Sequence, residues 1–133
     1  RVTREGAAAT VVSYGRHLLI CNEIADELKS ENINIEVIDM MSLFPYDWQT
    51  IRASIAKTKR VIFVNEDTEV TNFGEHLSQR VVTELFYELA ARPRVVAGKN
   101  LPGIGLHPNL EDASVPQKHD LKREILELIG EVP

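Results

Sequence analysis

The chain has 133 residues, of which 44% are hydrophobic and 26% charged, a composition that fits one domain with a single hydrophobic core. Its formal net charge of −5 argues against a nucleic-acid groove, because phosphate binding needs a basic face. One cysteine excludes a disulfide framework and a Cys-based zinc site, and no apolar run approaches the roughly 18 residues that a membrane span needs. We therefore expect a cytoplasmic protein without nucleic-acid or membrane partners.

Along the first half of the chain, strand signals alternate with helix signals. Residues 8–14 are rich in β-branched side chains and end at Gly15, which predicts a strand. Apolar residues then recur at helical spacing over 18–28, before a second strand signal over 33–38. Asp47 follows as the expected cap of a second helix.

The second half continues this alternation but adds a long loop. The remaining expected elements are strand 61–64, a helix capped at Asn72 that ends before Arg92-Pro93, strand 94–97, a loop over 99–118 and a helix from Asp120 to Gly130. Strands that alternate with helices predict a parallel, three-layer α/β/α sheet with right-handed crossovers. A loop of this length is unusual in a compact domain, which indicates a functional or interface role.

Histidine, cysteine and glycine residues are the first candidates for chemistry. No two of the four histidines share a helix at metal-ligand spacing, but His107 lies in the long loop and is a candidate for reaching into the cleft of a larger assembly. Cys21 falls on an apolar helix stripe, which predicts a core residue. Gly103-Ile104-Gly105 lies inside the long loop rather than between a strand and a helix, and so predicts a tight turn instead of a nucleotide site.

Acidic residues follow two of the expected strands. Asp39 ends the second strand, and Glu66, Asp67 and Glu69 follow the third. Because ligands of parallel α/β sheets bind beyond the carboxyl ends of the strands, these acids are candidates for Mg²⁺ binding or acid–base chemistry. The alternative is structural: Asp39 caps local backbone, and the other three lie in a solvated loop.

Five segments, in order, carry a family resemblance. They are Thr10–Gly15 (like T-I-V-T-Y-G), Val37–Asp47 (like V-I-D-L-R-T-L-x-P-x-D), Ser54–Arg60 (like S-V-x-K-T-G-R), Glu66 with Asn72–Glu75 (like E-x-x-x-G-F-G-x-E), and Pro102 with Leu110–Pro116 (like P-x-P…L-E-x-x-x-x-P). Together they resemble the transketolase C-terminal domain, in the form found in the beta subunit of thiamine-diphosphate-dependent 2-oxo acid dehydrogenases. Met41 departs from the pattern, since the family usually has Arg there.

The resemblance implies a fold and a role. The fold is a five-stranded, mostly parallel sheet with one short antiparallel strand. Residues 1–6 are then the end of a linker or that edge strand, and residues 7–133 are a single domain of a longer chain. The domain itself is implied to be non-catalytic and without a cofactor, while thiamine diphosphate and Mg²⁺ bind elsewhere in the full enzyme. Its implied partners are the other domains and subunits of the dehydrogenase and the subunit-binding domain of the dihydrolipoyl acyltransferase.

Within this family the branched-chain, 2-oxoisovalerate type is favoured over the pyruvate type. Two alternatives stay open. In the first, the domain belongs to another thiamine enzyme, such as transketolase or deoxyxylulose-phosphate synthase. In the second, it is a free-standing α/β module that binds a ligand or a protein.

Two sets of residues are candidates for partner contacts. The first is the apolar turn after the second strand, formed by Met40, Met41, Leu43 and Phe44. Methionine suits irregular contact surfaces, although these side chains alternatively pack into the domain's own core. The second set, Glu124, Glu127 and Glu131 near the C-terminus, forms either a docking face for a basic domain or a solvated helix face.

Overall fold

A five-stranded sheet forms the centre of the structure, a computed structural model that describes residues 1–103 and 106–132. Its strands are β1 (Val2–Arg4), β2 (Thr10–Ser13), β3 (Glu36–Asp39), β4 (Val61–Thr68) and β5 (Arg94–Gly98), in the order β1-β3-β2-β4-β5. Strands β2 to β5 are parallel, and β1 pairs antiparallel with β3. The predicted fold class is therefore confirmed, including its short antiparallel strand.

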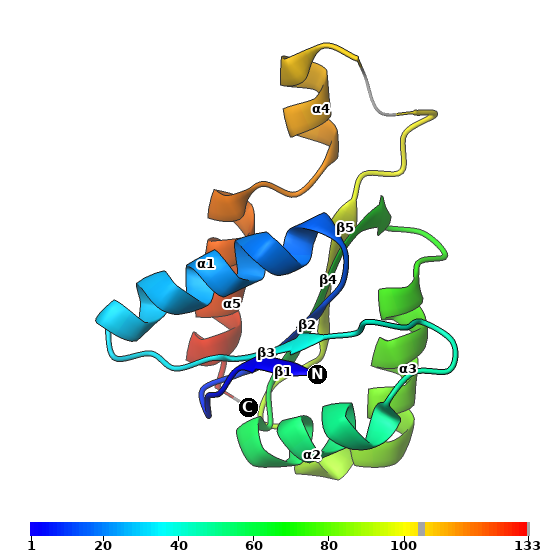
Figure 1. The fold of residues 1–133 in the computed structure, drawn as a ribbon. Helices are drawn as coiled ribbons and strands as arrows, with labels where there is room; N and C mark the ends of the chain where they lie inside the picture. The colour runs from blue at the N-terminus through cyan, green and yellow to red at the C-terminus, as the bar shows by residue number, and fades with distance from the viewer. Residues whose placement is uncertain (104–105, 133) are drawn as a thin grey trace.

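Helices cover both faces of this sheet, which gives three layers (Figure 1). The helices are α1 (Arg16–Ser30), α2 (Trp48–Thr58), α3 (Phe73–Leu85), α4 (Pro108–Ser114) and α5 (Lys118–Gly130), with a 3₁₀ turn, η1, at Phe86–Glu88. One core cluster joins α1 and α5 to the sheet, and the other joins α2 and α3 to the opposite face. Among the described residues, no helix is both long and apolar enough to cross a membrane.

The two core clusters follow from the alternation of side chains along each strand. In β2, Val11 packs with α1 and α5, whereas Val12 packs with α2 and α3. The same alternation separates Ile62 from Phe63 in β4. Each of these side chains is almost completely buried, so both faces of the sheet need apolar residues. This is why the central strands read as continuous apolar runs in the sequence.

Helix caps confirm two of the predicted starts. The carboxylate of Asp47 accepts the backbone N–H of Thr50 at 3.1 Å, and Asn72 Oδ1 accepts that of Glu75 at 3.2 Å. Each bond satisfies a backbone donor that the first helical turn leaves free. Helix α3 ends at Leu85, earlier than predicted, and is followed by η1.

The carboxyl-end segments differ more from the predictions. Strand β4 continues to Thr68, because its last residues pair with Gly98 of β5 beyond a register shift, so Glu66 and Asp67 lie in a strand and not in a loop. The predicted loop over 99–118 contains helix α4 and the first residue of α5. The tight turn predicted at Gly103-Ile104-Gly105 falls partly outside the described residues.

Candidate interaction surface

Exposed apolar side chains gather where the chain leaves the carboxyl ends of β3, β4 and β5. We call these segments, residues 40–47, 69–72, 99–103 and 106–114, the carboxyl-end rim. They lie along one edge of the sheet because the three strands are parallel. The exposed large apolar side chains of the rim are Met41, Leu43, Phe44, Val70, Leu101, Leu106 and Leu110. Exposed large apolar side chains are candidates for contact with partners.

The start of the β3–α2 loop is fixed by two neighbouring residues with different roles. Met40 is only 7% exposed and packs in the core cluster with Trp48. Asp39 Oδ1 accepts the backbone N–H of Met41 at 3.1 Å, and Asp39 Oδ2 pairs with Arg1 at 3.2 Å. The contacts of Asp39 therefore agree with the structural alternative, in which this residue caps local backbone.

The end of the same loop is held by a polar and aromatic cluster on α3. Tyr46 packs edge-on against Phe73, with ring centroids 5.4 Å apart. Its hydroxyl accepts a hydrogen bond from Arg80 at 2.7 Å and shares one with His76 Nε2 at 2.9 Å. The Arg80 guanidinium also stacks on Trp48, 4.3 Å from the ring centroid.

Between these two anchored ends the apolar turn points to solvent. Phe44 is 92% exposed and Met41 71% exposed. The structure thus divides the predicted interface set: Met40 belongs to the domain's own core, which corrects that part of the prediction, while Met41, Leu43 and Phe44 stay available for a partner. Their role as an interface remains a prediction.

Two of the acids near the end of β4 have a local backbone partner. The carboxylate of Asp67 accepts the backbone N–H of Thr68, and Glu69 accepts that of Asn100. Burial, helped by the negative charges of Asp67 and Glu66, raises the pKa of Tyr14 beside them. Within residues 1–103 and 106–132, no group of three or more His, Cys, Asp or Glu side chains is arranged to hold a metal ion.

His17, which the sequence did not single out for function, fixes the base of the rim. Its side chain is 1% exposed, and its Nε2 lies 3.0 Å from the carbonyl oxygen of Pro116. Since a carbonyl oxygen only accepts, Nε2 carries the proton and donates. The other ring nitrogen, Nδ1, faces Glu66 at 3.9 Å, too far for a hydrogen bond. His17 therefore ties α1 to the chain that follows α4.

His107 lies on the rim as the N-cap of α4. It is exposed, and its Nδ1 accepts the backbone N–H of Asn109 at 3.3 Å. The contact of His107 with a larger assembly stays a prediction. Leu106 and Leu110, on either side of it, were not predicted as site residues from the sequence. The available signals were the Pro108 start of a helix and the spacing of four between the two leucines.

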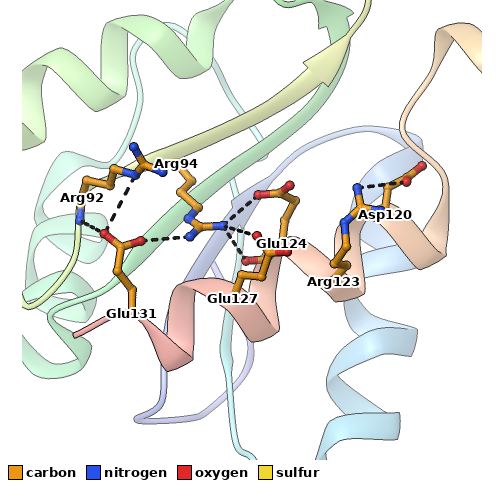
Figure 2. Close-up of polar contacts among 7 residues, drawn as sticks. All are labelled: Arg92, Arg94, Asp120, Arg123, Glu124, Glu127 and Glu131. Carbon is orange, nitrogen blue, oxygen red and sulfur yellow. Dashed lines mark hydrogen bonds and ion pairs between the residues drawn. The ribbon is translucent and has the colours of Figure 1, made fainter.

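The three glutamates near the C-terminus converge on one arginine (Figure 2). Arg94 Nη1 donates to Glu124 at 2.9 Å and to Glu127 at 3.2 Å, and Nη2 donates to Glu131 at 2.9 Å. The bond from Arg94 is the main cause of the lowered pKa of Glu131, and the same bond raises the pKa of Arg94. A basic docking domain would have to compete with Arg94 for these carboxylates, and such docking stays a prediction.

Comparisons with known proteins match one protein family over most of the chain. A family model described as "Transketolase, C-terminal domain" matches residues 1–121. The chain is 31% identical over 121 residues to the pyruvate dehydrogenase E1 component subunit beta of Rickettsia felis, a match that covers 91% of this chain and 37% of that protein. It is 37% identical over 101 residues to the 2-oxoisovalerate dehydrogenase subunit beta of Pseudomonas aeruginosa, a match that covers 76% of this chain and 28% of that protein.

A solved structure is similar over the whole chain. The structure described as "Split gene transketolase, inactive beta4 tetramer" matches with a TM-score of 0.85 at 22% identity, over 100% of this chain and 43% of that one. At this identity the likeness concerns the fold alone. The chain spans 37% of the first of the curated relatives above, so it corresponds to a part of such a subunit.

Proposed function

The chain belongs to the family of transketolase C-terminal domains, and we propose that it is the assembly domain of the beta part of a 2-oxo acid dehydrogenase. In this role the domain packs domains and subunits of the decarboxylating component together, while the chemistry takes place elsewhere in the enzyme. The relatives that support the proposal are named as beta subunits of pyruvate and 2-oxoisovalerate dehydrogenases.

The observation that carries the proposal is the presentation of Phe44. This side chain is 92% exposed, yet the loop that bears it is fixed at one end by buried Met40 and at the other by the hydrogen bonds of Tyr46. An exposed large aromatic side chain on a loop whose two ends are fixed has the properties of an interface anchor, because little backbone entropy is lost when a partner covers it.

We propose that this domain does not itself bind thiamine diphosphate and Mg²⁺. A magnesium diphosphate site needs several oxygen ligands around one point, and no such acid cluster exists among the described residues. Of the carboxylates nearest to the strand ends, those of Asp39, Asp67 and Glu69 accept hydrogen bonds from local backbone groups. We therefore place the cofactor in other parts of the full enzyme and derive no catalytic step from this domain.

Substrate, partner and location are finer parts of the proposal. The 37% identity to a 2-oxoisovalerate-type subunit supports a branched-chain 2-oxo acid, with pyruvate as the competing substrate. We propose the subunit-binding domain of the acyltransferase as a further partner. We propose the cytoplasm as the location, because the single cysteine is buried and free.

The test is an activity assay of the native protein that contains this chain, purified with the subunits that accompany it. We expect thiamine-diphosphate-dependent decarboxylation of 2-oxoisovalerate, with slower turnover of pyruvate. Transfer of a two-carbon unit between sugar phosphates, without activity on either 2-oxo acid, would overturn the proposal in favour of a transketolase.

A further inference from the structure

The imidazole of His17 is buried, but only one of its two nitrogens is paired. Nε2 donates to the carbonyl oxygen of Pro116 at 3.0 Å. Nδ1 is buried as well and has no hydrogen-bond partner among the described residues. Since Nε2 carries the proton of the neutral ring, Nδ1 is an acceptor. Buried polar atoms are normally paired, so this open acceptor inside the domain needs an explanation.

The group that faces Nδ1 is the carboxylate of Glu66 in β4. Its Oε2 lies 3.9 Å from Nδ1. The Glu66 side chain is 49% exposed and, unlike Asp67 and Glu69, accepts no hydrogen bond from the described residues. Two acceptors therefore face each other with no hydrogen between them. A proton on Nδ1 would allow a charge-assisted hydrogen bond of about 2.8 Å, which the carboxylate reaches by moving about 1 Å.

The backbone at the start of α1 keeps this carboxylate near the imidazole. Gly15 is the N-cap of α1 and offers no side-chain cap. A Cβ at Gly15 would lie 3.8 Å from Glu66 Oε1, so the carboxylate reaches the amino end of the helix. A helix amino end attracts negative charge, which favours the position of Glu66 beside His17.

The other titratable and charged groups around His17 do not compete for this role. Cys21, one turn later on α1, stays a thiol because burial raises its pKa to about 12. Tyr14 stays a phenol, since burial and the two acids at the end of β4 raise its pKa. Arg16 faces Glu111 of α4, with 3.5 Å between the charged groups. The segment after α4 contributes a backbone carbonyl, and α5 contributes apolar side chains.

We propose that His17 and Glu66 form a pH-sensitive clamp at the base of the carboxyl-end rim. In mild acid Nδ1 takes up a proton from solvent, and the carboxylate of Glu66 closes onto it. The imidazole then joins α1, the end of β4 and the chain after α4, whereas at higher pH only the bond to Pro116 is present. Burial disfavours an isolated charge on the ring, so uptake of the proton depends on Glu66.

The clamp acts on the segment that carries α4. The carbonyl of Ser114 accepts the backbone N–H of Lys99 at 2.9 Å, next to the carbonyl of Pro116 that His17 holds. A closed clamp should therefore reduce local opening of residues 112–118. This inference goes beyond the proposed function and does not depend on it, because it concerns contacts within the domain.

Hydrogen–deuterium exchange of the native protein that contains this chain, followed by mass spectrometry, measures this opening. Exchange of residues 112–118 is compared at about pH 7.5 and about pH 5.5, because histidine ordinarily titrates between these values while glutamate stays ionised. After correction for the intrinsic pH dependence of exchange, we expect protection to be roughly threefold or more higher at the lower pH.

Three variants separate the clamp from other effects of pH. Glu66→Gln removes the charge that the clamp needs, so the increase in protection should disappear. His17→Gln keeps an N–H donor for Pro116 but does not titrate, and it should also lose the increase. The matched control is Glu69→Gln, an acid nearby in sequence that already accepts the backbone N–H of Asn100, and it should keep the increase.

A wild type whose protection is equal at both pH values would overturn the proposal, as would an increase that survives in Glu66→Gln. Failure of the proposed function looks different, because a protein without 2-oxo acid turnover would still show the increase.

Discussion

Arg94 shows what a single side chain from a distant strand does to the charges of a helix. Its guanidinium is 14% exposed and binds carboxylates at three positions near the C-terminus. The sequence shows the three glutamates as an acidic run, but their partner lies about 30 residues earlier and is brought to them only by the packing of α5 beside β5. The sequence pattern therefore indicates the three negative charges but not the arginine that neutralises them.

Replacing Arg94 by alanine should destabilise the fold. The substitution removes a charged hydrogen-bond donor and leaves Glu124, Glu127 and Glu131 repelling one another, so we expect a loss of about 1–3 kcal/mol in the free energy of unfolding. Urea denaturation measures it. The control is Arg123→Ala, whose side chain is 58% exposed, and its effect should stay within about 0.5 kcal/mol. Equal losses in both variants would contradict this account of Arg94.

The carboxyl group of Glu36 makes the stability of the domain depend on pH. Burial alone would raise the pKa of its carboxyl, but hydrogen bonds from Lys57, Ser54 and Gly6 outweigh burial and lower it. A lowered folded-state pKa means that the stabilisation is present above the unfolded value of about 4.3 and is lost as the pH falls through the folded value.

The substitution Glu36→Gln tests this response. The wild type should be more stable than the variant at pH 6, and the difference should shrink steadily below about pH 4. Urea titrations at a series of pH values measure both proteins. A difference that is constant from pH 6 to pH 3 would show that the charge of Glu36 does not stabilise the fold.

At the scale of the elements, the sequence predicted those features correctly that depend on residues a few positions apart. The caps at Asp47 and Asn72 were correct because each side chain bonds backbone three residues away. The extension of β4 to Thr68 was missed because it depends on pairing with Gly98, which no local pattern contains. Helix α4 was missed because the prolines and glycines around it are more typical of a loop.

Two glycines in helices give a matched pair of predictions. A Cβ at Gly74, in the first turn of α3, would lie 2.8 Å from Asn72 Oδ1 and 3.1 Å from Val95 Cγ1, whereas a Cβ at Gly130 in α5 would meet nothing within 4 Å. Gly74→Ala should therefore cost about 1–3 kcal/mol of unfolding free energy through overpacking. Gly130→Ala should change it by no more than about 0.5 kcal/mol.

Thermal and urea unfolding of the two variants measure the difference. Both substitutions add the same methyl group to a helix, so helix propensity largely cancels between them. A Gly74→Ala variant as stable as Gly130→Ala would mean that the α3–β5 contact relaxes without cost.

At the scale of the whole molecule, the order of strands and helices was predictable, but the surface was not. The alternation of elements indicated the three layers, and the family resemblance added the antiparallel strand at the N-terminus. Met40 and Met41 are identical neighbours in the sequence, yet one is 7% and the other 71% exposed. Only the path of the chain after β3, with Met41 in the left-handed region at φ 50°, separates them.

The central claim is that this domain contributes contacts and no chemistry, and Phe44 tests it most directly. The measurement is the rate of 2-oxo acid decarboxylation by the native enzyme as a function of subunit concentration, for the wild type and Phe44→Ala. We predict that the variant needs on the order of tenfold more subunit for half-maximal activity, because an interface anchor is lost. Its kcat at saturating subunit concentration should equal that of the wild type. A variant with unchanged concentration dependence but a lower kcat would contradict the claim.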